Sequence, residues 1–255
     1  MTKGSGFQEI QTLLSFPVGG PQERKRLLVA ALLGFAGFII PVIPGIFLIG
    51  YGGLIMQSII HEKAQPAMPE WKDWGKIFTL GLRMLGAAFV YSLPAVLAVL
   101  LGYVGLMVPA LLEALSQAKD YTGSPPFGGL DVLGMFGGMA LLGIGLILLA
   151  PLSVMLPPML GHVAATDSFA AAFHFRAWWR VFRANLGGFA VALVLAAGLY
   201  FIVIFVLQIL YLTIILCIAI PFLLAFLIAY LTIIANALFA EAYREGSANL
   251  SGTGS

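Results

Sequence analysis

Two segments of this 255-residue sequence combine basic and aromatic side chains at helical spacing. The first lies near residues 70–82 and continues to Arg83, and the second lies near residues 167–184. Lysine and arginine bind phosphate and carboxylate groups, and tryptophan favours the boundary between lipid headgroups and hydrocarbon. The residues that we predict to contact lipid headgroups or a partner protein are Trp71, Lys72, Trp74, Lys76, Arg83, Arg176, Trp178, Trp179, Arg180 and Arg183.

The spacing in both segments predicts amphipathic helices that lie in the plane of the membrane surface. In the first segment the lysines fall about 120° around the helix from the tryptophans. In the second, Arg176, Arg180 and Arg183 form one basic stripe on the side opposite the aromatic residues. Such a helix suits the headgroup region, where each basic residue near an anionic leaflet contributes about 1 kcal/mol. Simple anchoring of a polytopic protein explains the same residues without any specific lipid.

Other residues with reactive or metal-binding side chains are few. No spacing suggests a Ser-His-Asp triad, a carboxylate pair, or a zinc or phosphate motif, so we predict no catalytic residue, no enzymatic activity and no cofactor. His162 is a weak candidate ligand for a metal or haem, since no second histidine is expected to face it. A single cysteine, Cys217, excludes an internal disulfide.

Composition places the chain in a membrane. Hydrophobic residues make up 61% of the sequence and charged residues 9%, whereas a soluble domain carries about 25% charged residues. We therefore predict an all-α, polytopic transmembrane helical bundle. The formal net charge of +2 is too small to indicate a nucleic-acid partner.

Four uncharged stretches set the positions of the membrane spans: 27–60, 84–112, 132–166 and 186–240. Pro41 and Pro44 interrupt the first stretch, and the last is too long for one span, so both are expected to form hairpins. We predict one transmembrane domain over 24–245, with about six spans near 24–40, 45–63, 83–105, 131–155, 186–211 and 218–241. Residues 1–23 are expected to form an interfacial segment, 120–129 the main external loop, and 246–255 a disordered tail.

The distribution of positive charge fixes the orientation. With six spans and the N-terminus in the cytoplasm, 12 of the 13 lysine and arginine residues face the cytoplasm, and only Lys119 lies outside. This asymmetry is the one that the positive-inside rule predicts, and it places both termini in the cytoplasm. No acidic or basic residue falls deep within a span, which disfavours a transporter that is coupled to ions or protons.

A family resemblance adds to this interpretation. The pattern Pro-Glu-Trp-x-Asp-Trp-Gly-x-x-Phe-x-x-Gly begins at Pro69 and follows Gly50-Tyr51-Gly52-Gly53. With the segment 168–182 and the final Ala237-x-Phe239-x-x-Ala242-Tyr243, it resembles an uncharacterised bacterial and archaeal membrane family, domain of unknown function 4013. The resemblance covers roughly residues 20–245. It implies a polytopic protein of a prokaryotic inner membrane, with no known activity.

A more distant likeness connects the chain to the membrane domains attached to some glycerophosphodiester phosphodiesterases. No phosphodiesterase domain is present in this sequence, so that activity is not carried over.

Three classes of function remain. We favour a non-enzymatic scaffold or accessory subunit, with membrane lipids and other membrane-protein subunits as its partners. The alternative is a passive carrier or channel for a lipid or a small neutral solute. A membrane-embedded enzyme that acts on lipid has the least support, because the sequence offers no catalytic groups.

Overall fold

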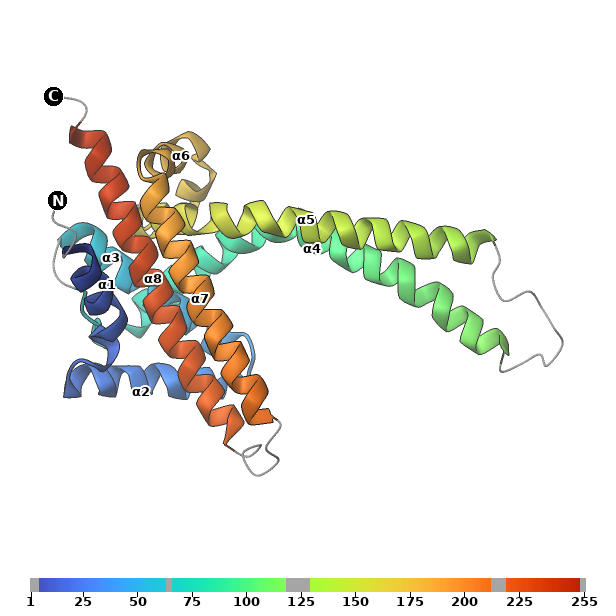
Figure 1. Ribbon diagram of the computed structural model, residues 1–255, viewed down its shortest axis with the longest axis horizontal. Coiled ribbons are helices and arrows are strands. Elements are labelled where there is room, and N and C mark those ends of the chain that lie inside the picture. Colours follow the sequence, from blue (N-terminus) through green and yellow to red (C-terminus); the bar gives the residue numbers. More distant parts are fainter. Residues whose placement is uncertain (1–4, 63–65, 118–128, 212–218, 253–255) are drawn as a thin grey trace. The chain divides into compact units, whose positions relative to one another are not determined.

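The computed structural model describes residues 5–62, 66–117, 129–211 and 219–252 (Figure 1). Most of these residues form helices, and none of them forms a strand, which confirms the all-α prediction. In chain order the elements are α1 (Ser5–Ser15), η1 (Phe16–Val18), α2 (Pro21–Ala36), α3 (Ile43–Glu62), α4 (Trp74–Gln117), α5 (Gly129–Thr166), η2 (Phe169–Phe173), α6 (Phe175–Ala184), α7 (Leu186–Tyr211) and α8 (Ile220–Gly252).

Five of these helices are long and apolar enough to cross a membrane: α3, α4, α5, α7 and α8. Helix α2 has 16 residues, fewer than the roughly 20 that cross a hydrocarbon core of about 30 Å. The count of six spans therefore stays a prediction that depends on α2. Some positions on which the predicted topology depends lie outside the described residues: Lys3, Lys63, Lys119, residues 120–128, and residues 212–218, where the last hairpin is expected to turn.

The break in the first hairpin falls at the two prolines. Helix α2 ends at Ala36 and α3 begins at Ile43. Pro44 occupies the first turn of α3, where a backbone N–H has no partner within the helix and its loss is harmless. Pro21 starts α2 in the same way.

Three element bounds differ from those expected. Helix α4 begins at Trp74 and runs without interruption into the long apolar stretch, so residues 70–82 do not form a separate helix. Residues 167–184 form a short 3-10 helix followed by α6. Helix α8 continues to Gly252, whereas we expected a disordered tail from residue 246. Gly246 is buried against Val181 of α6, and this contact supports the additional turns.

The chain divides into two compact units. The first comprises Met1–Ala87 and Pro157–Ser255, and α8 is its central helix, in contact with α2, α3, α6 and α7. Residues of α8 such as Ala229, Ile234 and Ala237 are almost fully buried. Small side chains at these positions let neighbouring helices approach closely, as is typical of helix packing in membranes.

The second unit, Ala88–Leu156, is a hairpin made from parts of α4 and α5. Its two helices meet at glycines: a Cβ atom on Gly138 would lie 2.8 Å from the Gly102 carbonyl oxygen. Most large apolar side chains of the hairpin point away from this seam and are exposed. They include Phe89, Leu97, Leu101, Val104, Leu111, Leu133, Phe136, Leu146 and Ile147. Lipid is the solvent in which such a surface is stable.

Candidate functional site

Residues 66–73, which include the Pro-Glu-Trp motif, pack against α2 and α3 of the first unit. The Tyr51 hydroxyl donates a hydrogen bond to the Pro69 carbonyl oxygen at 2.8 Å. The Tyr51 ring stacks on the Trp71 indole, with their centroids 3.9 Å apart. The Trp71 indole N–H in turn donates to the Arg26 carbonyl oxygen at 3.0 Å. Trp71 is therefore part of the packing between three segments.

The glycines of the motif permit a close crossing of α3 and α4. A Cβ atom on Gly81 would lie 2.9 Å from the Gly50 backbone nitrogen and would overlap the Ile46 carbonyl oxygen. A Cβ atom on Gly50 would overlap the Ile77 carbonyl oxygen in the same way. Because the opposing atoms belong to the backbone, only glycine fits at either position.

Asp73 determines where α4 begins. Its carboxylate accepts a hydrogen bond from the Lys76 backbone N–H at 2.9 Å, and its carbonyl oxygen accepts one from Ile77 at 3.0 Å. This is the geometry of an N-terminal cap, in which a side-chain oxygen satisfies one of the free N–H groups of the first turn. The family-like motif thus encodes a cap, a glycine crossing and an aromatic stack.

A groove of about 390 Å³ lies beside this motif. Its lining residues are Gln22, Lys25, Arg26, Val29, Glu70 and Trp71. The Arg26 guanidinium contacts the Met68 carbonyl oxygen and lies 3.2 Å from the Glu70 carboxylate. Lys72 pairs with the same carboxylate. Lys25 is exposed and belongs to none of the ion pairs among the described residues.

Basic neighbours favour the charged form of Glu70. A hydrogen bond from Lys72, the positive charge of Lys72 and the nearby Arg26 lower the pKa of the Glu70 carboxyl below its usual value. Of the charged residues that line the groove, Lys25 and Arg26 are basic and Glu70 is acidic, so the lining has a net positive charge.

Helix α6 carries the second predicted cluster, and its two faces differ sharply. Trp178 is fully buried, and its indole N–H donates to the Ala172 carbonyl oxygen at 3.0 Å. Val181 and Phe182 are buried on the same side. Arg176, Arg180 and Arg183 are exposed. The helix contains no acidic residue, and these arginines form none of the ion pairs among the described residues.

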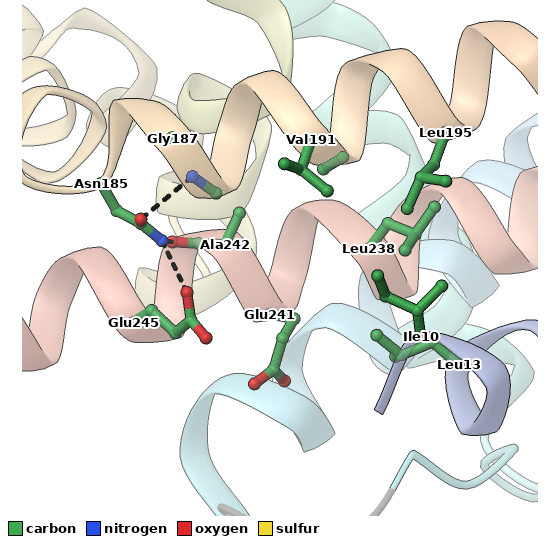
Figure 2. A pocket seen from close by; sticks show the side chains of 12 residues that line it. Ile10, Leu13, Asn185, Gly187, Val191, Leu195, Leu238, Glu241, Ala242 and Glu245 are labelled. Atoms are coloured by element: carbon green, nitrogen blue, oxygen red, sulfur yellow. Dashed lines mark hydrogen bonds between the residues drawn. The ribbon is translucent and has the colours of Figure 1, made fainter. Parts of the chain in front are cut away.

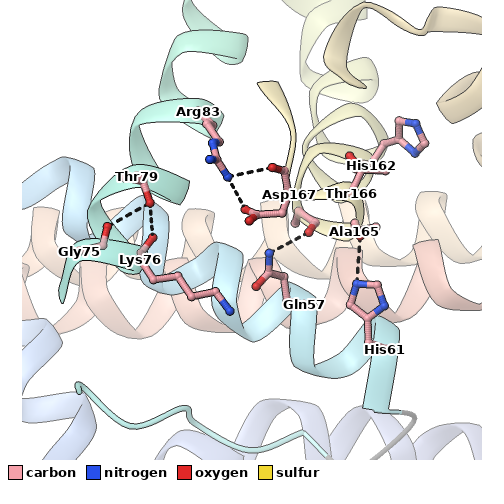
Figure 3. Close-up of polar contacts among 11 residues, drawn as sticks. Gln57, His61, Gly75, Lys76, Thr79, Arg83, His162, Ala165, Thr166 and Asp167 are labelled. Atoms are coloured by element: carbon pink, nitrogen blue, oxygen red, sulfur yellow. Dashed lines mark hydrogen bonds and ion pairs between the residues drawn. The ribbon is translucent and has the colours of Figure 1, made fainter. Parts of the chain in front are cut away.

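Side chains from α3 and α4 bind the carbonyl groups at the end of α5 (Figure 3). The Gln57 amide donates to the Ala164 carbonyl oxygen at 3.0 Å, and His61 Nε2 lies 3.0 Å from the Ala165 carbonyl oxygen. One nitrogen of Arg83 contacts both the carbonyl oxygen of Asp167 at 2.8 Å and its carboxylate at 2.7 Å. The last carbonyls of a helix lack partners within it, so these contacts complete the C-terminus of α5.

Asp167 itself adopts a left-handed backbone conformation, with a φ of 49°. Aspartate tolerates this conformation better than most residues do. A residue in the left-handed conformation commonly ends a helix. The Arg83 contact holds the chain in this conformation where α5 turns into η2.

Replacing Arg83 with glutamine is expected to reduce the free energy of unfolding by about 1 kcal/mol, because both partners are partly exposed and water screens the pair. Arg83→Lys is expected to keep part of this contribution. Unfolding in detergent at low and high salt tests the prediction, and the difference between wild type and Arg83→Gln should shrink at high salt. Equal stability at low salt would contradict it.

His162 contacts a tyrosine from α8. Its Nδ1 lies 2.6 Å from the Tyr243 hydroxyl oxygen, and Gly161 leaves room for the Tyr243 ring. Across the described ranges, no group of three or more His, Cys, Asp or Glu side chains is arranged to hold a metal ion. Tyr243, the last residue of the family-like pattern, therefore connects α8 to α5 through its contact with His162.

The structure separates the ten predicted contact residues into two groups. Trp71 and Trp178 pack internally, Arg83 pairs with Asp167 and Lys72 pairs with Glu70. The remaining six are exposed or partly exposed: Trp74, Lys76, Arg176, Trp179, Arg180 and Arg183. Sequence reasoning did not assign Lys25 and Arg26 to a site, although the run Arg24-Lys25-Arg26 was a signal that could have found them.

Comparison with known proteins identifies one family. A family model described as "Protein of unknown function (DUF4013)" matches residues 33–212, more than half of the chain. No curated protein and no solved structure matches the sequence. The matched range includes the Tyr51–Trp71 stack, the α3–α4 crossing and α6, whereas α8 and most of α2 lie outside it. The chain belongs to the DUF4013 family of proteins of unknown function.

Proposed function

We propose that this integral membrane protein is a non-enzymatic scaffold or accessory subunit that binds anionic lipid through the arginine stripe of α6. The observation that carries the proposal is the exposure of Arg176, Arg180 and Arg183 on a helix without acidic residues. Three like charges on one face repel each other in the absence of a counter-charge. Phosphate groups of an anionic leaflet supply that counter-charge.

The packing of α6 fixes the direction in which these arginines point. Trp178, Val181 and Phe182 hold the opposite face in the protein, so the helix cannot rotate to hide its charges. A preorganised cationic face loses less entropy on binding than a mobile one. At about 1 kcal/mol for each arginine, the stripe contributes a factor on the order of 100 to the retention of anionic lipid.

The groove beside α2 supports the same function. Lys25 and Arg26 offer positive charge, while Gln22 offers an amide and Val29 an apolar contact. Leu28 and Leu32, which are exposed on α2, provide a surface for acyl chains next to it. In this proposal, the basic segments and both termini face the cytoplasm, and the protein resides in the inner membrane of a prokaryote.

Reversal of the stripe tests the proposal. In Arg176→Glu/Arg180→Glu/Arg183→Glu, phosphatidylglycerol retained on the detergent-purified protein is expected to fall about 100-fold, as counted by native mass spectrometry. Phosphatidylcholine should be retained as before, because it carries no net charge. The triple arginine-to-lysine variant keeps the charge and is the matched control. Unchanged retention of phosphatidylglycerol in the glutamate variant would overturn the proposal.

A transport assay distinguishes the scaffold from the alternative class, a passive carrier or channel. A scaffold is expected to produce no flux of lipid or small neutral solutes in proteoliposomes. Flux that survives the reversal of all three arginines would favour the carrier and would remove the scaffold.

A further inference from the structure

A second groove, unrelated to the basic surfaces, lies between α1, α7 and α8 (Figure 2). Its volume is about 230 Å³. The apolar part is formed by Ile10 and Leu13 of α1, Val191 and Leu195 of α7, and Leu238 of α8. Helices α7 and α8 are both long and apolar enough to cross a membrane, so we expect the groove to lie within reach of bilayer lipid.

The other end of the groove is acidic. Glu241 and Glu245 both line it, and Glu241 pairs with Arg244. Glu245 accepts a hydrogen bond from the Asn185 amide at 2.9 Å and takes part in none of the ion pairs within the described ranges. Figure 2 shows Asn185 and Glu245 together at one end, with Leu195 and Leu238 at the other.

Asn185 holds this acidic end in place through its role as a helix cap. Its side-chain oxygen accepts a hydrogen bond from the Gly188 N–H at 3.1 Å, at the start of α7. Its amide also donates to the Ala242 carbonyl oxygen at 3.0 Å. Because both ends of the amide are engaged by the fold, Asn185 orients the Glu245 carboxylate and has little capacity left to bind a ligand itself.

We propose that this groove binds a phospholipid with a primary ammonium headgroup, of the phosphatidylethanolamine type. The ammonium would lie at Glu245, and part of one acyl chain would lie along Val191, Leu195 and Leu238. Charge complementarity decides the class of headgroup: the Glu245 carboxylate, which is in none of the ion pairs within the described ranges, attracts a cation and repels a lipid with only negative charge. A carboxylate that accepts a hydrogen bond from an ammonium gains a charge-assisted interaction that a quaternary ammonium cannot supply.

The size of the groove decides how much of the lipid is enclosed. Pockets that enclose a drug-sized ligand have volumes of about 300–1,000 Å³, and this groove is smaller. It therefore holds a segment of one chain beside the headgroup, and the rest of the lipid stays in the bilayer.

Gly187 offers a way to fill the groove without disturbing the fold. It lines the groove, and a Cβ atom there would meet no other atom within 4 Å. Leucine at this position is therefore expected to project into the space that the acyl chain would occupy. Gly198 lies on the same helix, is equally open and does not line the groove. Gly198→Leu is the matched control.

The test measures which lipids remain on the intact, purified protein after it is extracted from vesicles of equal phosphatidylethanolamine, phosphatidylcholine and phosphatidylglycerol. Glu245→Gln keeps the shape and removes the charge, and it is expected to reduce phosphatidylethanolamine retention roughly 10-fold. Gly187→Leu is expected to cause a similar loss, whereas Gly198→Leu should behave as wild type. Retention of phosphatidylglycerol should be unaffected in all three variants. A negative result for the groove can therefore be told apart from a negative result for the arginine stripe.

Several outcomes would overturn the proposal. Wild-type retention of phosphatidylethanolamine in both Glu245→Gln and Gly187→Leu would show that no such lipid uses the groove. Equal loss of phosphatidylcholine and phosphatidylethanolamine would remove the headgroup assignment. A loss of dimer mass in Gly187→Leu would assign it to a second copy of the chain.

Discussion

Replacing Gly81 with alanine is expected to lower the free energy of unfolding in detergent by about 3 kcal/mol or more. An added methyl group in a well-packed interior typically costs about 1–3 kcal/mol. At Gly81 it would overlap the Ile46 carbonyl oxygen and crowd the Gly50 nitrogen. Both are backbone atoms that no change of rotamer can move aside, so α3 and α4 must separate. The unfolding temperature, followed by intrinsic tryptophan fluorescence, measures the effect.

Gly198→Ala provides the control for the same substitution. No atom lies within 4 Å of a Cβ at this position, and alanine is favoured over glycine in a helix by about 1 kcal/mol. The unfolding temperature should therefore be unchanged or slightly raised. If Gly81→Ala and Gly198→Ala behave alike, α3 and α4 do not cross at Gly50 and Gly81.

Replacing Trp178 with alanine is expected to reduce the free energy of unfolding by about 3–5 kcal/mol, the range for removing a large aromatic side chain from a core. Trp178 is fully buried and supplies the hydrogen bond to the Ala172 carbonyl oxygen. Trp178→Phe should be intermediate, since it keeps most of the packing and loses a hydrogen bond worth about 1 kcal/mol. Thermal unfolding of the three proteins measures this order.

The neighbouring Trp179 is the matched control. It is only partly buried, and it stacks on Phe175 at the surface of α6 with their centroids 5.4 Å apart. Trp179→Ala is expected to cost much less stability than Trp178→Ala, on the order of 1 kcal/mol. A larger loss for Trp179 than for Trp178 would mean that the orientation of α6 is the reverse of the one described.

The local sequence predicts the helices and most of their ends. A run of apolar residues must satisfy its backbone in a helix if lipid surrounds it. Two prolines three residues apart, such as Pro41 and Pro44, disfavour a continuous helix, whereas the single prolines Pro94 and Pro109 lie inside α4. The break between α2 and α3 follows directly from these two rules. The start of α4 does not, because Trp71 and Lys72 fit the helical spacing. Helix α4 begins at Trp74 because Asp73 caps it and Trp71 stacks on Tyr51, a residue 20 positions earlier.

The same distinction applies to the candidate contact residues. The sequence by itself determined that Arg176, Arg180 and Arg183 share an outward stripe, since an unpaired charge is too costly to bury. It also determined the membrane class, from 61% hydrophobic and 9% charged residues. Only the tertiary structure decided that Trp71 and Trp178 point inward. In a membrane protein the interior and the lipid are both apolar, so hydrophobicity does not say which face of a helix meets its neighbours. That choice depends on which backbone groups and small residues the fold brings opposite each ring.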